Sequence, residues 1–257
     1  MSLASEGVPE LGELFNWKFG LWGVPFLNWT VFAMLVAFLL AAAFLLTAFS
    51  KREVIPGKYQ LIGESLVGFV RTNIAEEVIG HDGARYVPYL LTTFTMIFFF
   101  NFMEVFPGVA FPPTSKIAVP LFFAAIAWIV YNVEGMRSNG VGGYFKEILF
   151  PPGVPKALYI LLTPIEFLSN IVIRPITLTL RLTFNMLAGH LILSLLAILL
   201  MNVADFGHFG PKFLAAPFVI LIGVGLTGFE IFVGFLQAFI FTVLTALYIG
   251  GAVHPQH

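Results

Sequence analysis

Eight polar side chains interrupt the long apolar runs in the C-terminal part of the chain. Four can carry a charge, three are amides and one is an imidazole: Glu166, Arg174, Arg181, Glu230, Asn170, Asn185, Gln237 and His190. An ionisable side chain inside an apolar segment is costly, by about 3 kcal/mol for an arginine at the centre of a membrane helix. These positions therefore indicate a functional site, and a carboxylate with a histidine is typical of a proton relay.

Arg181 gives the strongest indication, because a long and mostly apolar stretch follows it. On a helix, Arg174 lies two turns before Arg181 and Asn185 one turn after it, so the three side chains share a face. The alternative for both arginines is structural. Each could snorkel to the membrane interface, and Arg181 could instead form an ion pair.

His190 and Glu230 are expected to meet if the last two apolar runs form an antiparallel hairpin, because both lie at a similar chain distance from its turn. His190 lies half a helical turn round from Arg181, on the opposite face. Gln237 follows Glu230 by two turns on nearly the same face. Two structural alternatives stay open: His190 as a hydrogen-bonded packing residue, and a protonated Glu230 bonded to the backbone.

The composition indicates what must position these residues. Hydrophobic residues make up 59% of the 257 and charged residues only 11%, against about 25% charged in soluble domains. So few charges cannot cover a soluble surface, so the chain is predicted to be an all-α polytopic membrane protein. The net charge of −1, with no basic run, gives no indication of a nucleic-acid partner.

We expect one integral-membrane domain over residues 1–257. Its predicted parts are a first span at 28–50, an amphipathic surface helix at 60–80, a hairpin at 86–133 and a long hairpin at 157–253. The Gly- and Pro-rich stretch between the hairpins reads as a polar loop. The two hairpins and the first span give about five transmembrane helices.

The two arms of the last hairpin are too long for vertical spans. As straight helices they would reach about 70 and 60 Å, roughly twice the 30 Å hydrocarbon core. Neither arm contains a polar turn at its middle. We therefore expect strongly tilted helices, or helices broken near Pro175.

The amphipathic helix is predicted from a helical stripe of apolar residues, with charged residues off the stripe. It either lies at the membrane surface or packs on a partner helix. The stripe comprises Ile62, Leu66, Phe69, Val70, Ile74 and Val78, and the charged residues are Glu64, Arg71 and Glu76.

Lysine and arginine placement predicts the orientation. Two loops on one side carry Lys51, Arg52, Lys58, Arg71, Arg85, Arg137, Lys146 and Lys156, and the other side carries Lys18, Lys116 and Lys212. The positive-inside rule then puts the N-terminus outside and the C-terminus in the cytoplasm. The N-terminal segment carries acidic residues and no early basic ones, so it does not read as a signal or transit peptide. A bacterial plasma membrane is favoured over an organellar inner membrane.

Several kinds of chemistry are excluded or unsupported. The chain has no cysteine, which excludes disulfides, thiolate metal sites and cysteine nucleophiles. Its five histidines are dispersed, so no metal site and no cofactor are expected. No serine–histidine–aspartate set, phosphate-binding loop or dinucleotide fingerprint is present.

The polar residues stand in motifs that resemble a known family. "TLTLRLTFNMLAGH" and the later "LQAFIFTVLTALYI" are similar to subunit a of the F-type ATP synthase membrane sector, and so are "NFMEVFPG", "GVGGYFKE" and "TPIEF". The resemblance covers nearly the whole chain from Phe15. It implies five transmembrane segments, with the last two forming a steeply tilted hairpin against a ring of c subunits.

The resemblance also implies a function and roles for residues. The chain would be a non-catalytic stator subunit that forms two offset proton half-channels and couples proton translocation to ATP synthesis. Arg181 would be the essential stator arginine, with Asn185 beside it and Gln237 facing it. His190 and Glu230 would line the outer half-channel. The implied partners are the c-ring, b-type peripheral stalk subunits, the F1 sector through the complex, and membrane lipid.

An inner half-channel would lie near Glu166 and Asn170, with Arg174 close by. The sequence departs from the family pattern where many members carry an acidic residue near the first hairpin turn. This chain has "TSKIAV" there, with Lys116, and it has Phe184 before the asparagine.

The rival hypothesis is a self-contained proton-coupled secondary transporter, with a substrate site built from Arg181, Glu230 and Glu166. It predicts inverted repeats, which the sequence does not show.

Overall fold

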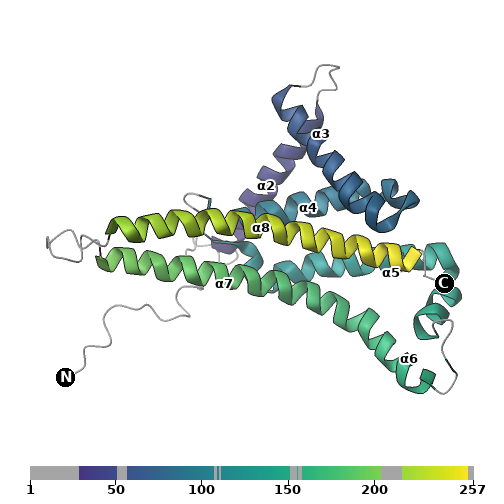
Figure 1. The fold of residues 1–257 in the computed structure, drawn as a ribbon. Coiled ribbons are helices and arrows are strands. Elements are labelled where there is room, and N and C mark those ends of the chain that lie inside the picture. The colour runs from purple at the N-terminus through teal and green to yellow at the C-terminus, as the bar shows by residue number, and fades with distance from the viewer. Residues whose placement is uncertain are drawn as a thin grey trace, which may run out of the picture.

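The computed structural model describes residues 29–50, 57–106, 109, 111–150, 155, 158–203 and 216–253. Helices make up almost all of these residues, and no strand occurs among them. This confirms the predicted all-α class. Figure 1 shows a long helical hairpin with a second, shorter group of helices packed against one side of it.

The hairpin consists of α7, Arg174–Val203, and α8, Ala216–Val253. The two helices lie side by side and run antiparallel (Figure 1). They have 30 and 38 residues, which gives lengths of about 45 and 57 Å. Both exceed the hydrocarbon thickness of about 30 Å, so the helices fit a membrane only when strongly tilted, as predicted.

The first arm stays helical past Pro175, and only its geometry changes, just before the position where a break was one of the two predictions. The α6 helix, Tyr159–Leu168, leads into a wider π-helical segment, η6, Ser169–Ile173, and then into α7. Proline lacks the N–H that would bond the carbonyl four residues earlier, and its ring crowds that carbonyl. The helix is wider in this π-helical segment than in an α-helix, and such segments often occur at functional sites.

The predicted polar loop between the hairpins is largely helical, which corrects that prediction. The α5 helix, Ala118–Leu149, is interrupted only at Gly140, where φ is 70° and ψ is 156°. Glycine adopts this left-handed φ without steric cost. The chain turns back there, because the Tyr144 hydroxyl donates to Asn132 Oδ1 at 2.9 Å and the Tyr144 ring packs against Gly135. The polar, glycine-rich stretch that read as a loop is therefore a helix that is interrupted at one residue, Gly140.

The remaining helices cover one side of the hairpin. The first span is α2, Trp29–Ser50, and the helix before α5 is α4, Val87–Phe102. The two helices of the predicted 86–133 hairpin do not pack mainly on each other, because α4 packs on α8 and α2 whereas α5 packs on α7 and α8. Short 3-10 turns, η3 at His81–Tyr86 and η4 at Pro113–Ser115, precede α4 and α5. Among the described residues, four helices are long and apolar enough to cross a membrane. The predicted fifth span, α4, has 16 residues, or about 24 Å.

The amphipathic segment packs on helices of this chain. It forms α3, Lys58–Val70, continued by the π-helical η2, Arg71–Ile79. Most of the predicted stripe is buried or half-buried, although Ile62 is exposed. Gly63 of α3 lies against Ala48 of α2, and Gly250 of α8 lies against the backbone of η2. Of the two alternatives, the structure therefore supports packing on partner helices.

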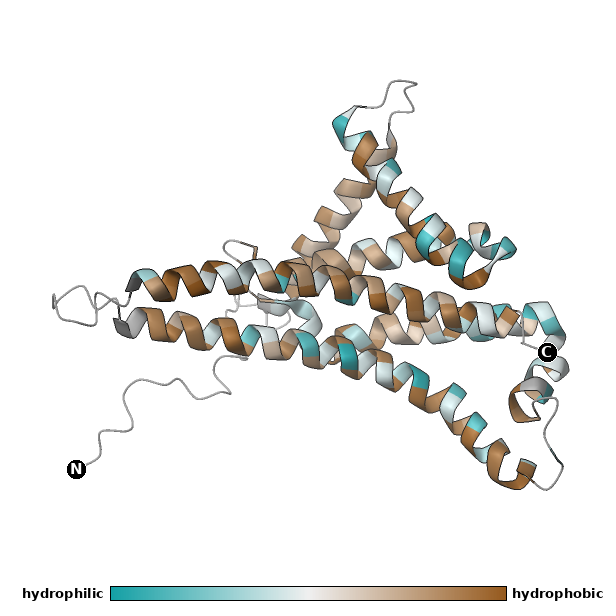
Figure 2. Cartoon of the chain, viewed as in Figure 1, coloured by the Kyte–Doolittle hydropathy of each residue, from teal (hydrophilic) through white to brown (hydrophobic). Residues whose placement is uncertain are grey.

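Large apolar side chains remain exposed on the hairpin, and Figure 2 shows that apolar residues, in brown, predominate along α7 and α8. Phe184 is 59% exposed and Leu221 is 70% exposed. Exposed apolar patches of this kind mark contact with lipid or with another protein. Polar residues interrupt the apolar surface of α7 midway along the helix (Figure 2).

Candidate functional site

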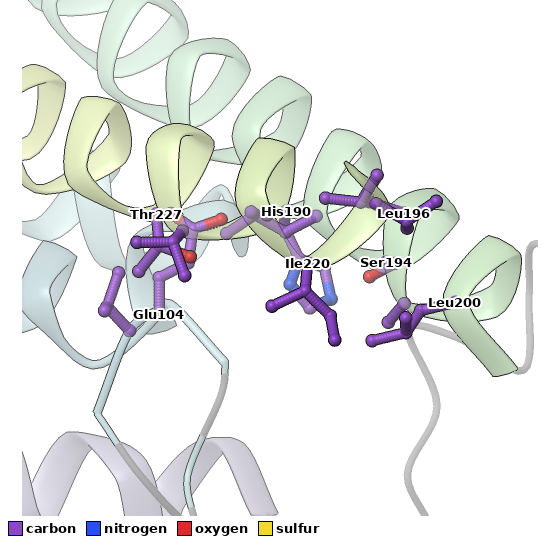
Figure 3. Close-up of a pocket in the computed structure, with 13 residues that line it drawn as sticks. Glu104, His190, Ser194, Leu196, Leu200, Ile220 and Thr227 are labelled. Atoms are coloured by element: carbon purple, nitrogen blue, oxygen red, sulfur yellow. The ribbon is translucent and has the colours of Figure 1, made fainter. Parts of the chain in front are cut away.

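A cavity of about 530 Å³ lies between α7 and α8, toward the C-terminal end of α7 and the N-terminal end of α8, which we call the turn side of the hairpin. Its lining is apolar except for Glu104, His190, Ser194 and Thr227. Figure 3 shows Glu104 and Thr227 at one end, Leu200 at the other, and His190 between them. His190 is only 9% exposed, and its ring lies 5.5 Å from the Phe111 ring in an edge-on contact. The cavity thus brings a carboxyl group and an imidazole together beneath apolar walls.

Glu230 of α8 lies against α7 at the residue before His190, and direct contact between the His190 and Glu230 side chains stays a prediction. Its carboxylate packs directly against Gly189, the residue before His190. Glu230 is buried, and its Oε2 has no hydrogen-bond partner within the described part of the chain. We name Glu104, His190 and Glu230 the turn-side cluster. A buried carboxyl without partners is costly unless it is protonated or reached by water or a partner group.

Hydrogen bonds hold the turn-side cluster between three elements. Asn101, at the end of α4, donates from Nδ2 to the carbonyl oxygen of Gly234 on α8 at 3.2 Å. Thr114 of η4 donates from its hydroxyl to Asn101 Oδ1 at 2.8 Å. All three residues are buried. The end of α4 and η4 are thereby fixed to α8 next to Glu230.

Glu104 was missed as a candidate from the sequence alone. It is 5% exposed, and its Oε1 is buried without a hydrogen-bond partner among the described residues. A signal was present, because Glu104 stands in "NFMEVFPG", the stretch that ends an apolar run. In sequence it lies at the end of its helix, where a solvated carboxylate is the ordinary expectation. Only the fold shows that α7 and α8 bury this helix end.

Gly189 provides a test of the register. A Cβ at this position would collide with the Glu230 carboxylate. That carboxylate ends a flexible side chain, so we expect Gly189→Ala to leave the helices in place and to displace the carboxyl group, a strain of about 1–3 kcal/mol. Proton flux through the assembled complex should fall severalfold.

The matched control for this substitution is Gly68→Ala. Gly68 is exposed on α3, with open space at its Cβ, and the substitution should leave the flux unchanged. Equal flux in both variants would contradict the close approach of Gly189 and Glu230.

A second polar cluster surrounds the π-helical break. Asn170 is buried, and its Nδ2 donates to the Glu166 carbonyl oxygen at 2.9 Å and lies 3.4 Å from Glu166 Oε2. The Tyr131 hydroxyl donates to the Asn170 carbonyl oxygen at 2.6 Å. The Arg174 guanidinium lies 5.0 Å from the centre of the Tyr248 ring. We name these residues the α6-side cluster.

Tyr131 and Tyr248 were also missed from the sequence, where they read as ordinary aromatic residues of apolar helices. Their rings lie 5.7 Å apart, so they join α5 and α8 beside the break. A cation over a ring face is stabilised by the ring quadrupole, and more so when desolvated. Tyr248 therefore gives Arg174 a partner inside the protein, which favours the helix-packed position over the snorkelling alternative.

Arg181 lies on α7 between the two clusters. It is exposed, as is neighbouring Phe184, and it takes part in none of the ion pairs found among the described residues. Asn185 is half-buried. Gln237 is 5% exposed, and its Nε2 makes no hydrogen bond within the described part of the chain. The structure thus does not join Gln237 to Arg181, and the facing arrangement stays a prediction.

Within the described ranges, no group of three or more histidine, aspartate or glutamate residues could hold a metal ion. The two clusters instead lie apart along the first arm of the hairpin. Asn170 and His190 are twenty positions apart, or about 30 Å along a helix axis. Arg181 lies near the midpoint between them.

Comparisons with known proteins agree with one another. A model of the family described as ATP synthase A chain matches residues 29–250. The chain is 43% identical to ATP synthase subunit a of Frankia alni over 211 residues, covering 81% of this chain and 72% of that protein. It is 37% identical to ATP synthase subunit a of Rhodococcus erythropolis over 253 residues, covering 96% and 90%.

Proposed function

The chain belongs to the ATP synthase A chain family, the membrane-embedded stator of the proton channel, and on this premise we propose that the two clusters are the ends of two proton half-channels separated by Arg181. The observation that carries the proposal is the position of Arg181, exposed on α7 about halfway between two buried polar clusters. The alternative of a self-contained transporter finds no support in the comparisons.

The turn-side cluster supplies the outer half-channel. Protons enter through the cavity, which Glu104 and His190 line, and reach Glu230 beside Gly189. Carboxyl and imidazole groups bind and release protons without a change of covalent structure, which is what a relay requires. The proton then passes to a carboxylate on a neighbouring c-ring, which as a neutral acid can turn into lipid.

The α6-side cluster supplies the inner half-channel. Glu166 and Asn170 stand beside the π-helical break, where the widened backbone and half-buried polar groups provide an exit path. Arg174 lies over Tyr248, so its positive charge is held at this exit. A proton that has travelled round with the ring leaves here into the cytoplasm.

Arg181 separates the two paths electrostatically. An arginine side chain does not give up its proton in proteins, so Arg181 cannot pass a proton from one path to the other. Its charge attracts the ionised form of the ring carboxylate and favours proton release there. One elementary charge that crosses 100 mV supplies about 2.3 kcal/mol, which drives rotation. The chain itself makes and breaks no covalent bond in this scheme.

The exposed surfaces support the proposed partners. The face of α7 that carries Arg181 and Phe184 is exposed and polar at its middle, and it suits a ring whose carboxylates pass the arginine. Other exposed apolar faces suit lipid and b-type peripheral stalk subunits, with F1 held through the complex. Asn185 would border the ring contact, and Gln237 would support it from α8.

The protein is an integral membrane protein, and the positive-inside rule favours a bacterial plasma membrane with the N-terminus outside. The exposed residue Lys146 would then lie in the cytoplasm. Because the chain has no cysteine, single-cysteine labelling tests this orientation. Lys146→Cys should react from the cytoplasmic side and Ser5→Cys from the outside, and the reverse pattern would overturn it.

Glu104→Gln is the substitution that tests the outer half-channel. It keeps the size of the side chain and removes its ability to bind and release a proton, so we expect ATP-driven proton pumping by inverted vesicles to fall by roughly tenfold or more. Assembly of the complex should remain intact. The matched control is Glu77→Gln, because Glu77 is exposed on η2. Equal pumping by both variants would refute the role of the turn-side cluster.

A further inference from the structure

At the junction of η6 and α7, a proline stands where the helix would supply an N–H to a backbone carbonyl. The bonds of a π-helix join residues five apart, and the Arg174 N–H accordingly donates to the Ser169 carbonyl oxygen. The next bond of this pattern would join the Asn170 carbonyl oxygen to the N–H of residue 175. That residue is Pro175, which has no N–H. The π-helical pattern therefore stops at the Asn170 carbonyl.

A tyrosine hydroxyl from another helix takes the place of that N–H. Tyr131 of α5 donates to the Asn170 carbonyl oxygen at 2.6 Å. Tyr131 is 1% exposed and Asn170 is 7% exposed, so water has little access to this bond. A buried carbonyl without a donor costs the free energy of its lost hydration. The Tyr131 hydroxyl removes this cost at the residue where the π-helical bonds end.

Tyr131 also supports the other end of the junction through its ring. The Tyr131 ring lies 5.7 Å from the Tyr248 ring, and the Arg174 guanidinium lies 5.0 Å from the centre of the Tyr248 ring. The arm is thus held at Asn170 and again, four residues later, at Arg174. The contact at Asn170 extends to Glu166, whose carbonyl oxygen accepts from Asn170 Nδ2 at 2.9 Å.

The register of η6 sets the direction in which these side chains point. Without the hydroxyl, the Asn170 carbonyl could bond the Arg174 N–H, four residues further on, and the segment would return to an α-helix. A shift by one residue turns the preceding helix by about 100° about its axis. Glu166 and Asn170 would then turn by this angle relative to Arg181. The bond that ends η6 therefore also fixes the side chains on which the proposed exit path depends.

We propose that Tyr131 is a positioning residue of the inner half-channel. Its hydroxyl stands in for the N–H that Pro175 lacks, and it holds η6 in the π-helical register that presents Glu166 and Asn170 to the exit path. The inference rests on the function proposed for the α6-side cluster.

The experiment measures ATP-driven proton pumping by inverted vesicles that contain the intact complex. Tyr131→Phe removes the hydroxyl and keeps the ring against Tyr248, so the complex should assemble and pumping should fall by roughly fivefold or more. The matched control is Tyr86→Phe, because Tyr86 is 5% exposed and its hydroxyl donates to Glu134 Oε2 at 3.0 Å. This control also removes a buried tyrosine hydroxyl, which belongs to neither cluster, and pumping should stay unchanged.

A second substitution distinguishes the bond from simple packing of the ring. Pro175→Ala gives the arm an N–H that can bond the Asn170 carbonyl in place of the hydroxyl. Tyr131→Phe should therefore lower pumping by less than about twofold in the Pro175→Ala chain, the range within which independent effects add. Equal fold losses in the wild-type and Pro175→Ala chains would overturn the inference, and so would wild-type pumping by Tyr131→Phe alone.

Failure of the proposed half-channel has a different signature. Glu166→Gln keeps the size of the side chain and removes its ability to bind and release a proton, so pumping should fall if the α6-side cluster carries protons. Unchanged pumping in Glu166→Gln would refute the half-channel itself. A loss in Glu166→Gln together with wild-type pumping in Tyr131→Phe would refute only the positioning role of Tyr131.

Discussion

Replacing Arg181 by alanine is expected to lower ATP-driven proton pumping and proton-driven ATP synthesis by roughly a hundredfold or more, the scale on which loss of one preorganised charge acts. The complex should still assemble, because Arg181 is exposed and joins no ion pair among the described residues. Arg181→Lys should fail as well, since a compact ammonium lacks the planar fork with which a guanidinium holds a carboxylate. Both activities are measured on the same inverted vesicles.

The control for the two Arg181 variants is Arg71→Ala. Arg71 is exposed and its 2.7 Å ion pair with Glu76 lies on the surface, where such pairs contribute little to stability. We expect wild-type activity from this variant. Near-normal coupled synthesis in Arg181→Ala or Arg181→Lys would contradict the stator role of Arg181.

An exchange of His190 and Glu230 should produce the second large effect. His190→Ala or Glu230→Ala alone should reduce proton flux about tenfold or more, because each removes a group that binds and releases the proton. His190→Glu alone places another carboxylate beside Glu230 and Glu104, whose charges disfavour one another. The double exchange, His190→Glu with Glu230→His, restores one acid and one imidazole.

We expect the double exchange to carry at least about threefold more flux than His190→Glu alone, which corresponds to the lower end of measured pairwise couplings. ATP-driven acidification of inverted vesicles from pH 6 to 8 checks this for all four variants. Losses that simply add in the double exchange would contradict the relay, because they would mean that His190 and Glu230 act independently. The close approach of Gly189 to the Glu230 carboxylate would then be a packing contact only.

The hairpin could be predicted from the sequence because its signals are long and simple. Two apolar runs far longer than a vertical span require tilt or a break, and Pro175 indicated where the helix geometry would change. Counting residues back from one turn predicted that His190 lies opposite Glu230, and the structure brings Glu230 against Gly189, the residue before His190. Helix length, the effect of proline and the residue count along a hairpin depend on helical geometry within the hairpin itself, and the packing of the other helices does not change them.

The errors arose where tertiary packing decided the outcome. The stretch around Gly140 has a loop-like composition, yet helix resumes after one residue because Tyr144 folds back onto Asn132 and Gly135. Glu104 lies just past the end of α4, and nothing in its local sequence shows that α7 and α8 cover it. Tyr131 and Tyr248 become informative only when they are found beside Asn170 and Arg174.

The measurement that tests the central claim most directly is proton leak through Arg181→Ala when the ring cannot turn. Vesicles with F1 bound, and with its rotation stopped by a nucleotide that cannot be hydrolysed, are given a potassium diffusion potential, and proton entry is followed. If Arg181 separates the two half-channels, wild-type vesicles should stay tight and Arg181→Ala vesicles should conduct protons. Arg181→Ala vesicles as tight as the wild type would contradict the account.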